Sequence, residues 1–237
     1  MQTKILKEGA VKFINRIYHK FYYNNPVKID DAKRKIMEYL PSDPVILEAG
    51  AFDGTDSLQM ANLWPKGVIH SFEPVAAVFN KAKANLQHIP NVQLYPFALS
   101  DTTGKTEINL SSGHSEASSS ILSPKKHLEV HPGVKFESKV MVDTFTIDDW
   151  AQKYQVDKID FAWLDLQGAE FKVLNGSPRI FSTINVLFTE VSLIETYSGV
   201  MLYPAFREWL ESHKFQVVLE DLPYKDMGNV LFVRQNL

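Results

Sequence analysis

Apolar runs and amphipathic segments alternate along most of the chain, and their periods predict strands and helices in turn. The apolar runs lack the alternation of a half-exposed strand, which is typical of parallel strands buried on both faces. We expect strands at 45–49, 68–72, 92–97, 159–164, 186–191, 215–219 and 229–234. Helices are expected at 56–63, 76–86 and 205–213. This order predicts an α/β fold, and the short turn-rich link between the last two runs predicts an antiparallel pair at the sheet edge.

Two segments depart from the strand–helix alternation. Residues 1–40 read as a helical N-terminal extension, which we expect to be a lid or packing helices before the main domain at 41–237. Residues 103–146 form an insertion, in which 105–110 and 135–142 alternate like the strands of a hairpin around a polar, serine-rich stretch. We expect this insertion above the carboxyl ends of the parallel strands, where open α/β sheets bind ligands.

Composition excludes several classes of function. The formal net charge of -3 gives no electrostatic case for binding nucleic acid or an anionic membrane. The absence of Cys excludes disulfides, thiolate zinc sites and cysteine nucleophiles. An apolar run of about 18 residues, the length needed to span a bilayer, is not present, nor is a signal-peptide pattern. We therefore expect a cytoplasmic protein without a transmembrane segment.

The first predicted strand ends in an acid and a glycine turn, at Glu48, Gly50 and Gly54. A glycine turn after a strand lets backbone N–H groups approach a ligand closely. Glu73 ends the next strand, roughly 20 residues further on, where a carboxylate can take the hydroxyls of a nucleoside ribose. This pair of features predicts a nucleoside-containing cofactor.

The spacing of the turn argues against a dinucleotide. In the phosphate-binding fingerprint Gly-x-Gly-x-x-Gly, a glycine would stand where this chain has Glu48. Asp53 adds a second carboxylate near the turn, and both would repel a pyrophosphate. They suit a cationic or zwitterionic ligand such as S-adenosylmethionine, which carries a sulfonium, an ammonium and a ribose diol but no phosphate.

Several segments, in this order and spacing, carry a resemblance to a known family. They are 45–54, 70–74, 97–104, 163–176 and 229–234. Together they resemble the class I S-adenosylmethionine-dependent methyltransferases, and within them the FkbM family, over about residues 41–237. The chain departs from the family's usual Asp-x-Glu-Gly-x-Glu by having Gln167 at the middle acid. The resemblance implies a Rossmann-like, seven-stranded, mostly parallel sheet with a reversed last strand. It also implies methyl transfer to a hydroxyl of a sugar, glycan or other small metabolite.

The cofactor residues follow from these segments. Glu48 is expected to accept a hydrogen bond from the methionine ammonium, directly or through water, and Glu73 to bind the ribose hydroxyls. Asp53 either contacts the methionine end or caps the following helix, and Asp101 either bonds the adenine amino group or serves a turn. The full set expected at the cofactor is Glu48, Gly50, Ala51, Asp53, Gly54, Glu73, Pro74, Phe97, Ala98, Leu99 and Asp101.

The chemistry points to carboxylates at the strand ends. A sugar hydroxyl is a poor nucleophile at neutral pH, so O-methylation calls for a base or a metal. Asp165 and Glu190 end the fourth and fifth predicted strands and are candidates for the base or for Mg²⁺ ligands; alternatively they only orient the cofactor or acceptor. His114, in the insertion, is a third candidate base or a solvated loop residue. Glu170 favours a helix N-terminus, so it is structural or catalytic.

Two other functional classes stay open at this point. An NAD-dependent oxidoreductase is disfavoured by Glu48 and by the lack of a Tyr-x-x-x-Lys pair near the fourth or fifth strand. A non-catalytic binding module that keeps the fold is disfavoured by the retained acids Glu48, Glu73 and Asp165. The expected partner is a small-molecule or glycan acceptor and not a nucleic acid, and assembly into a homo-oligomer is left open.

Overall fold

The computed structural model of the chain describes residues 31–235. The chain divides into two units, residues 1–38 and 39–237. Helix α2 (Asp31–Met37) belongs to the first unit and lies within the helical extension expected at 1–40. The rest of that extension lies outside the described residues, so its role as a lid or packing element stays a prediction.

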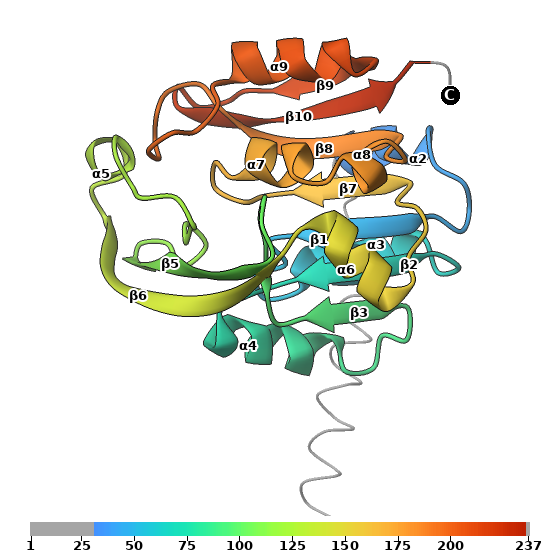
Figure 1. Cartoon of the computed structure of the whole chain (residues 1–237), viewed down its shortest axis with the longest axis horizontal. Helices are drawn as coiled ribbons and strands as arrows, with labels where there is room; N and C mark the ends of the chain where they lie inside the picture. The colour runs from blue at the N-terminus through green and yellow to red at the C-terminus, as the bar shows by residue number, and fades with distance from the viewer. Residues whose placement is uncertain (1–30, 236–237) are drawn as a thin grey trace, which may run out of the picture. The chain divides into compact units, whose positions relative to one another are not determined.

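A seven-stranded sheet forms the centre of the second unit (Figure 1). Its order is β3-β2-β1-β7-β8-β10-β9, and β10 alone runs antiparallel to its neighbours. The strands are β1 (Val45–Ala49), β2 (Val68–Phe72), β3 (Val92–Tyr95), β7 (Phe161–Leu164), β8 (Val186–Ser192), β9 (Phe215–Asp221) and β10 (Met227–Arg234). The predicted mostly parallel sheet with a reversed last strand is confirmed, as is the antiparallel pair at its edge.

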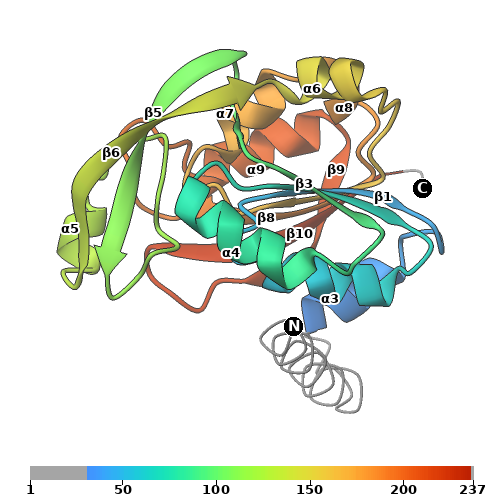
Figure 2. The ribbon, with the colours of Figure 1, turned by 90° about the horizontal axis from the view of Figure 1, so that it is seen from below.

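Helices cover both faces of this sheet (Figure 2). On one face lie α3 (Thr55–Leu63) and α4 (Ala76–Leu86). On the other lie α6 (Ile147–Tyr154), α7 (Glu170–Asn175), α8 (Pro178–Phe181) and α9 (Tyr203–Ser212). Because both faces are covered, strands such as β8 are buried at every residue, which explains why their sequences are continuous apolar runs.

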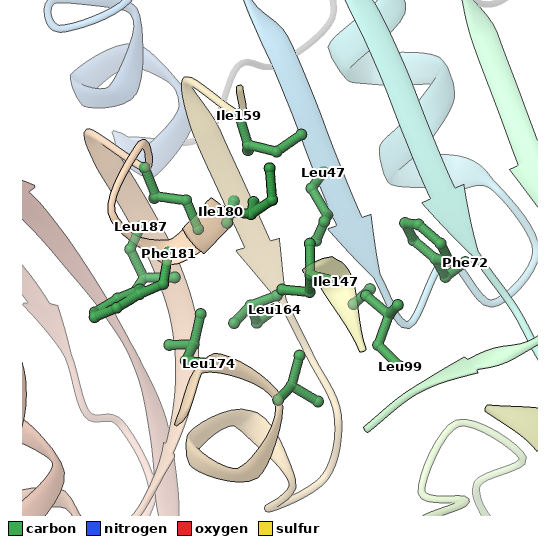
Figure 3. Close-up of a cluster of buried hydrophobic side chains, with 14 of the residues drawn as sticks. Leu47, Phe72, Leu99, Ile147, Ile159, Leu164, Leu174, Ile180, Phe181 and Leu187 are labelled. Atoms are coloured by element: carbon green, nitrogen blue, oxygen red, sulfur yellow. The ribbon is translucent and has the colours of Figure 1, made fainter. Parts of the chain in front are cut away.

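The main hydrophobic core fills the space between the sheet and the second group of helices (Figure 3). Strand residues Leu47, Leu164 and Leu187 pack there against Ile147, Leu174 and Ile180 of α6, α7 and α8, and all six are at most 1% exposed. Burial of each such side chain contributes about 1.5–3 kcal/mol. This packing fixes the strands against one another and therefore fixes the loops at their carboxyl ends.

The insertion forms a second, three-stranded sheet in the order β4-β6-β5. Strands β5 (Gly104–Gly113) and β6 (Val134–Phe145) are the expected hairpin, lengthened at both ends, and α5 (His127–Val130) lies between them. The single strand expected at 92–97 is wrong at its end. The chain leaves the main sheet after Tyr95, and β4 (Ala98–Leu99) pairs instead with Thr144 and Phe145 of β6. The insertion lies at the carboxyl ends of β1, β2 and β7 (Figure 1).

Within residues 31–235, no helix is long and apolar enough to cross a membrane. A cytoplasmic location stays a prediction.

Candidate active site

A cavity opens at the carboxyl ends of the central strands. The loops after β1, β2 and β7 form one side, and the insertion forms the other. Its walls consist of Gly50, Phe52, Phe72, Glu73, Pro74, Val75, Val78, Ala98, Leu99, Ile108, Glu116, Ala117, Ser119, Ile121, Asp165, Leu166 and Ala169. Segments far apart in the sequence therefore meet at the sheet edge where the sequence predicted a ligand.

The glycine turn after β1 brings the backbone against the neighbouring strand. Gly50 has a φ of +91°, and a Cβ at this position would lie 2.0 Å from the carbonyl oxygen of Asp165. Gly54 also has a positive φ, +83°, and a Cβ there would lie 2.7 Å from the Leu86 side chain. Only glycine fits both the conformation and the space, so the turn stays narrow and leaves room for a ligand beside it.

Glu73 presents its carboxylate to the cavity from the end of β2. Its Oε1 accepts a hydrogen bond from the Val75 N–H at 2.8 Å, and its Oε2 accepts one from the Phe52 N–H at 3.1 Å. Burial raises the pKa of Glu73 to about 7, although these two hydrogen bonds favour the ionised form. The carboxylate is thus held in one position, as a binding group for hydroxyls requires.

Glu48 and Asp53, the two other acids of the first motif, are engaged within the protein. Glu48 is buried and accepts hydrogen bonds from the hydroxyls of Ser57 and Ser71, the latter at 2.6 Å. Asp53 Oδ1 accepts from the Thr55 N–H at 3.0 Å and from its hydroxyl at 2.7 Å, at the residue where α3 begins. Asp53 therefore holds the turn before α3, whose N-cap residue is Gly54 without a side-chain cap, and its contact with the methionine end stays a prediction.

The remaining expected cofactor residues fall into two groups. Pro74, Ala98 and Leu99 line the cavity. Ala51 and Phe97 are buried beside it, and Asp101 forms an ion pair with Lys172 at 3.3 Å. The structure therefore brings together the first group and leaves Asp101 in a surface contact, where its adenine contact stays a prediction.

The carboxylates of Asp165 and Glu190 both accept hydrogen bonds from the side-chain amide of Gln167. Gln167 Nε2 lies 2.9 Å from Asp165 Oδ1 and 3.1 and 3.3 Å from the two carboxylate oxygens of Glu190. Asp165 lines the cavity and is solvent-accessible, whereas Glu190 is buried and lies off the cavity wall. Burial and the neighbouring acids Asp165 and Glu170 raise the pKa of Glu190 well above its usual range. Of the two acids, Asp165 is the one that an acceptor can reach.

The residues present do not fit a Mg²⁺ site. An amide N–H donor points at both carboxylates where a cation would need oxygen ligands. In the described part of the chain, moreover, no three His, Cys, Asp or Glu side chains are grouped so that they could hold a metal ion. The expected Mg²⁺ ligands Asp165 and Glu190 are thus close together but organised around Gln167.

His114 is placed at the end of β5, away from the cavity walls. Its backbone N–H donates to the Gly133 carbonyl at 3.0 Å, and its side chain packs on Gly133 and is exposed. The structure does not bring His114 to Asp165, so its role as a base stays a prediction that this placement does not favour.

Two contributors to the site went unrecognised in the sequence. Tyr197 places its hydroxyl 3.1 Å from Gln167 Oε1, and Phe52 lines the cavity with a φ of +48°. The departure at Gln167 from the family's acid was visible in the sequence, and the serine-rich stretch was expected near the ligand; its Ser120 donates to the backbone carbonyl of Gln167 at 2.9 Å. For Tyr197 no local signal exists, because its importance comes from a contact across 30 residues.

Glu170 provides a stability prediction. This carboxylate is buried at the first turn of α7, and its Oε1 accepts hydrogen bonds from the backbone N–H groups of Leu166 and Gly168. Burial raises the pKa of Glu170 to about 7 from 4.5, so ionisation costs the folded state stability as the pH rises from about 4.5 to 7. Glu170→Gln keeps the accepting oxygen and removes the charge. We expect its free energy of unfolding to exceed that of the unsubstituted protein by about 1–3 kcal/mol at pH 8.

Urea unfolding at pH 8 and pH 5 measures this difference, which should shrink to less than about 1 kcal/mol at pH 5, where Glu170 is protonated in the folded protein. Glu107→Gln, at an exposed acid paired with Lys139, is the control and should change stability little at either pH. A destabilised Glu170→Gln at pH 8 would contradict the expected cost of the buried charge.

Comparisons with known proteins agree with this geometry. A sequence model of the methyltransferase FkbM domain matches residues 48–217. The chain is 30% identical over 236 residues to the 2-O-methyltransferase NoeI of Sinorhizobium fredii, a match that covers 96% of each protein. Among solved structures, one chain of a fibrillarin/Nop5p complex aligns with a TM-score of 0.50 at 16% identity, over 85% of this chain and 79% of that one. At that identity the likeness shows the fold alone.

Both sequence matches extend over most of the chain, and the family model includes the glycine turn, Glu73 and Asp165. The interpretation as an enzyme that uses S-adenosylmethionine is confirmed, in place of an NAD-dependent oxidoreductase or a non-catalytic module. The chain belongs to the FkbM family of S-adenosylmethionine-dependent methyltransferases.

Proposed function

We propose that this methyltransferase acts on a hydroxyl of a sugar unit, in a glycan or a small glycosylated metabolite. The observation that supports this proposal most is the position of Asp165, which lines the cavity at the end of β7, beside the turn at Gly50. The relative NoeI, a 2-O-methyltransferase aligned along nearly the whole chain, supports an oxygen acceptor. Glu116 and Ser119 add polar groups to the same walls, as a polyhydroxylated acceptor requires.

The cofactor is proposed to lie along the loops after β1, β2 and β4. Gly50 keeps the first loop narrow, and Glu73 accepts hydrogen bonds from the ribose hydroxyls. Ala98 and Leu99 provide an apolar wall for the adenine ring. Glu48, held by Ser57 and Ser71 behind this loop, adds a negative charge near the methionine end.

S-adenosylmethionine supplies a methyl group that its sulfonium has already activated. Asp165 accepts the proton of the acceptor hydroxyl while the oxygen–methyl bond forms and the methyl–sulfur bond breaks. The products are the methyl ether, neutral S-adenosylhomocysteine and a protonated Asp165, which then returns its proton to water. The enzyme's further contribution is to align the two reactants and to exclude water.

A screen of uncharged glycosides tests this proposal. Purified protein is first titrated with S-adenosylhomocysteine by calorimetry, and turnover is then measured with labelled S-adenosylmethionine on methyl pyranosides that differ in which hydroxyl is blocked. We expect turnover to require one free ring hydroxyl and to survive dialysis against EDTA. Cofactor binding without turnover on any glycoside, together with turnover on an amine or a carboxylate acceptor, would overturn the sugar-hydroxyl assignment.

Glu73 makes cofactor binding depend on pH. Since ribose hydroxyls donate to the ionised carboxylate and the pKa of Glu73 is raised to about 7, affinity should be constant above pH 8 and fall below pH 7. The expected dissociation constant for S-adenosylhomocysteine is about tenfold higher at pH 6 than at pH 8.5. Calorimetry across this range measures the change.

Glu73→Gln is the matched control, because it keeps the size of the side chain and cannot ionise. Its affinity should be lower at pH 8.5, by about 1–3 kcal/mol for a lost charged hydrogen bond, and should not change with pH. A pH-dependent affinity that persists in Glu73→Gln would assign the titration to another group and remove Glu73 from the ribose site.

A further inference from the structure

Gln167 has a backbone conformation that its residue type disfavours. Its φ is +52°, in the left-handed region, and the next residue, Gly168, follows at +95°. A residue with a side chain in this region costs of order 1 kcal/mol, and such strain persists only where the surroundings hold it. Gln167 is also buried, at 8% exposure, so its polar side chain must be fully engaged.

The amide nitrogen of Gln167 engages the two strand-end acids. Its two hydrogens can reach Asp165 Oδ1 at 2.9 Å and the Glu190 carboxylate at 3.1 Å. Two carboxylates this close to a common atom repel each other, and a donor between them offsets that repulsion without adding a charge. An alanine, a glycine or an acid at 167 would leave the pair without this donor.

The other end of Gln167 is held by the insertion and by the loop after β8. Its Oε1 lies 3.1 Å from the Tyr197 hydroxyl, which also lies 2.8 Å from the Ser118 carbonyl. Its backbone carbonyl accepts a hydrogen bond from the Ser120 hydroxyl at 2.9 Å. Ser119, between these two serines, lines the cavity. One chain of contacts thus runs from residues 118–120 of the insertion through Gln167 to Asp165.

We propose that Gln167 is the positioning residue of this active site. It holds the Asp165 carboxylate in a fixed position relative to residues 116–121 of the insertion, and so sets the alignment of the acceptor hydroxyl with its base. This inference rests on the assignment of Asp165 as the base in the proposed function. The side chain does not line the cavity, so it acts through Asp165 and not on the acceptor itself.

The first test uses Gln167→Gly, which relieves the positive φ and removes only the side chain. The relieved φ offsets part of the cost of the lost hydrogen bonds, so we expect this variant to fold, which urea unfolding checks. With the best methyl pyranoside from the screen, we expect kcat to fall 10- to 100-fold, the scale of a misplaced catalytic group. The dissociation constant for S-adenosylhomocysteine and the KM for the pyranoside should stay within threefold, since no binding contact is removed.

Gln167→Met is the second variant, because it keeps the length of the side chain but has no N–H donor. We expect a similar loss of kcat. Tyr197→Phe removes the partner of Gln167 Oε1, and the double variant Gln167→Gly/Tyr197→Phe should lose no more than Gln167→Gly alone, since the two residues act in one chain of contacts.

A kcat within twofold of the unsubstituted protein in Gln167→Gly or Gln167→Met would overturn the inference, as would additive losses in the double variant. If the unsubstituted protein turns over no pyranoside, the sugar assignment fails and a structural readout decides the inference. Crystals of Gln167→Gly with S-adenosylhomocysteine should show the Asp165 carboxylate rotated from its position in the unsubstituted complex. An unmoved carboxylate would overturn the positioning role.

Discussion

Asp165→Asn should lower kcat by at least 100-fold while the dissociation constant for S-adenosylhomocysteine stays within threefold. Asparagine keeps the shape of the side chain and the Oδ1 atom that accepts the hydrogen bond from Gln167 at 2.9 Å. It loses the ability to take a proton from a hydroxyl, and a positioned general base contributes typically 10²–10⁴-fold. The effect therefore falls on the chemical step and leaves the cofactor site in place.

The measurement is single-turnover methyl transfer to the best pyranoside of the screen, with calorimetry on the same preparation. Asp143→Asn is the control, because that aspartate is exposed on β6 and pairs only loosely with Lys105, at 3.4 Å. It should change kcat by less than twofold. An Asp165→Asn enzyme with a kcat within threefold of the unsubstituted protein would show that the base is another group.

The cavity explains why Asp165 and not Glu190 has this role. Asp165 follows the last residue of β7 and Glu190 lies within the neighbouring parallel strand β8, and Leu164 of β7 pairs with Thr189 of β8 just before them. Glu190 is covered, and burial favours its protonated form. Asp165 faces the cavity walls, where an acceptor and water can exchange protons with it. Burial raises the pKa of both acids, so access to the cavity is what distinguishes Asp165 from Glu190.

The main sheet could be predicted from the sequence because its signals are local. Strands β1 and β2 and helix α4 begin and end where their apolar patterns do. Gly50 and Glu73 line one cavity, since parallel strands bring their carboxyl ends to the same edge, and their contacts with the cofactor stay predictions.

The rest of the site depends on contacts between distant segments, which one sequence cannot show. The end of the third strand was misplaced because Ala98 and Leu99 have the apolar character of a strand in either sheet, and only their pairing with β6 decides between them. His114 was a reasonable candidate by residue type, but the hairpin register directs it to Gly133. Tyr197 has no motif of its own, and its hydroxyl matters because the fold brings Gln167 to it.

Gly50→Ala should have the largest effect on the fold of the site. The added methyl group would lie 2.0 Å from the carbonyl oxygen of Asp165, a backbone atom that cannot swing aside as a side chain can. The positive φ of +91° adds strain of about 1–2 kcal/mol for a residue with a Cβ. Clash and strain together place the expected loss of unfolding free energy at about 3 kcal/mol or more, in the tail of the distribution for single substitutions.

Gly199→Ala separates the two contributions. Gly199 has a similar φ of +77°, but a Cβ there would meet no heavy atom within 4 Å, so this variant measures the strain alone. Urea unfolding should show Gly199→Ala destabilised by about 1 kcal/mol and Gly50→Ala by at least 2 kcal/mol more. Equal losses in the two variants would mean that the loop after β1 can shift to relieve the clash. The glycine turn would then not be what fixes this loop against Asp165.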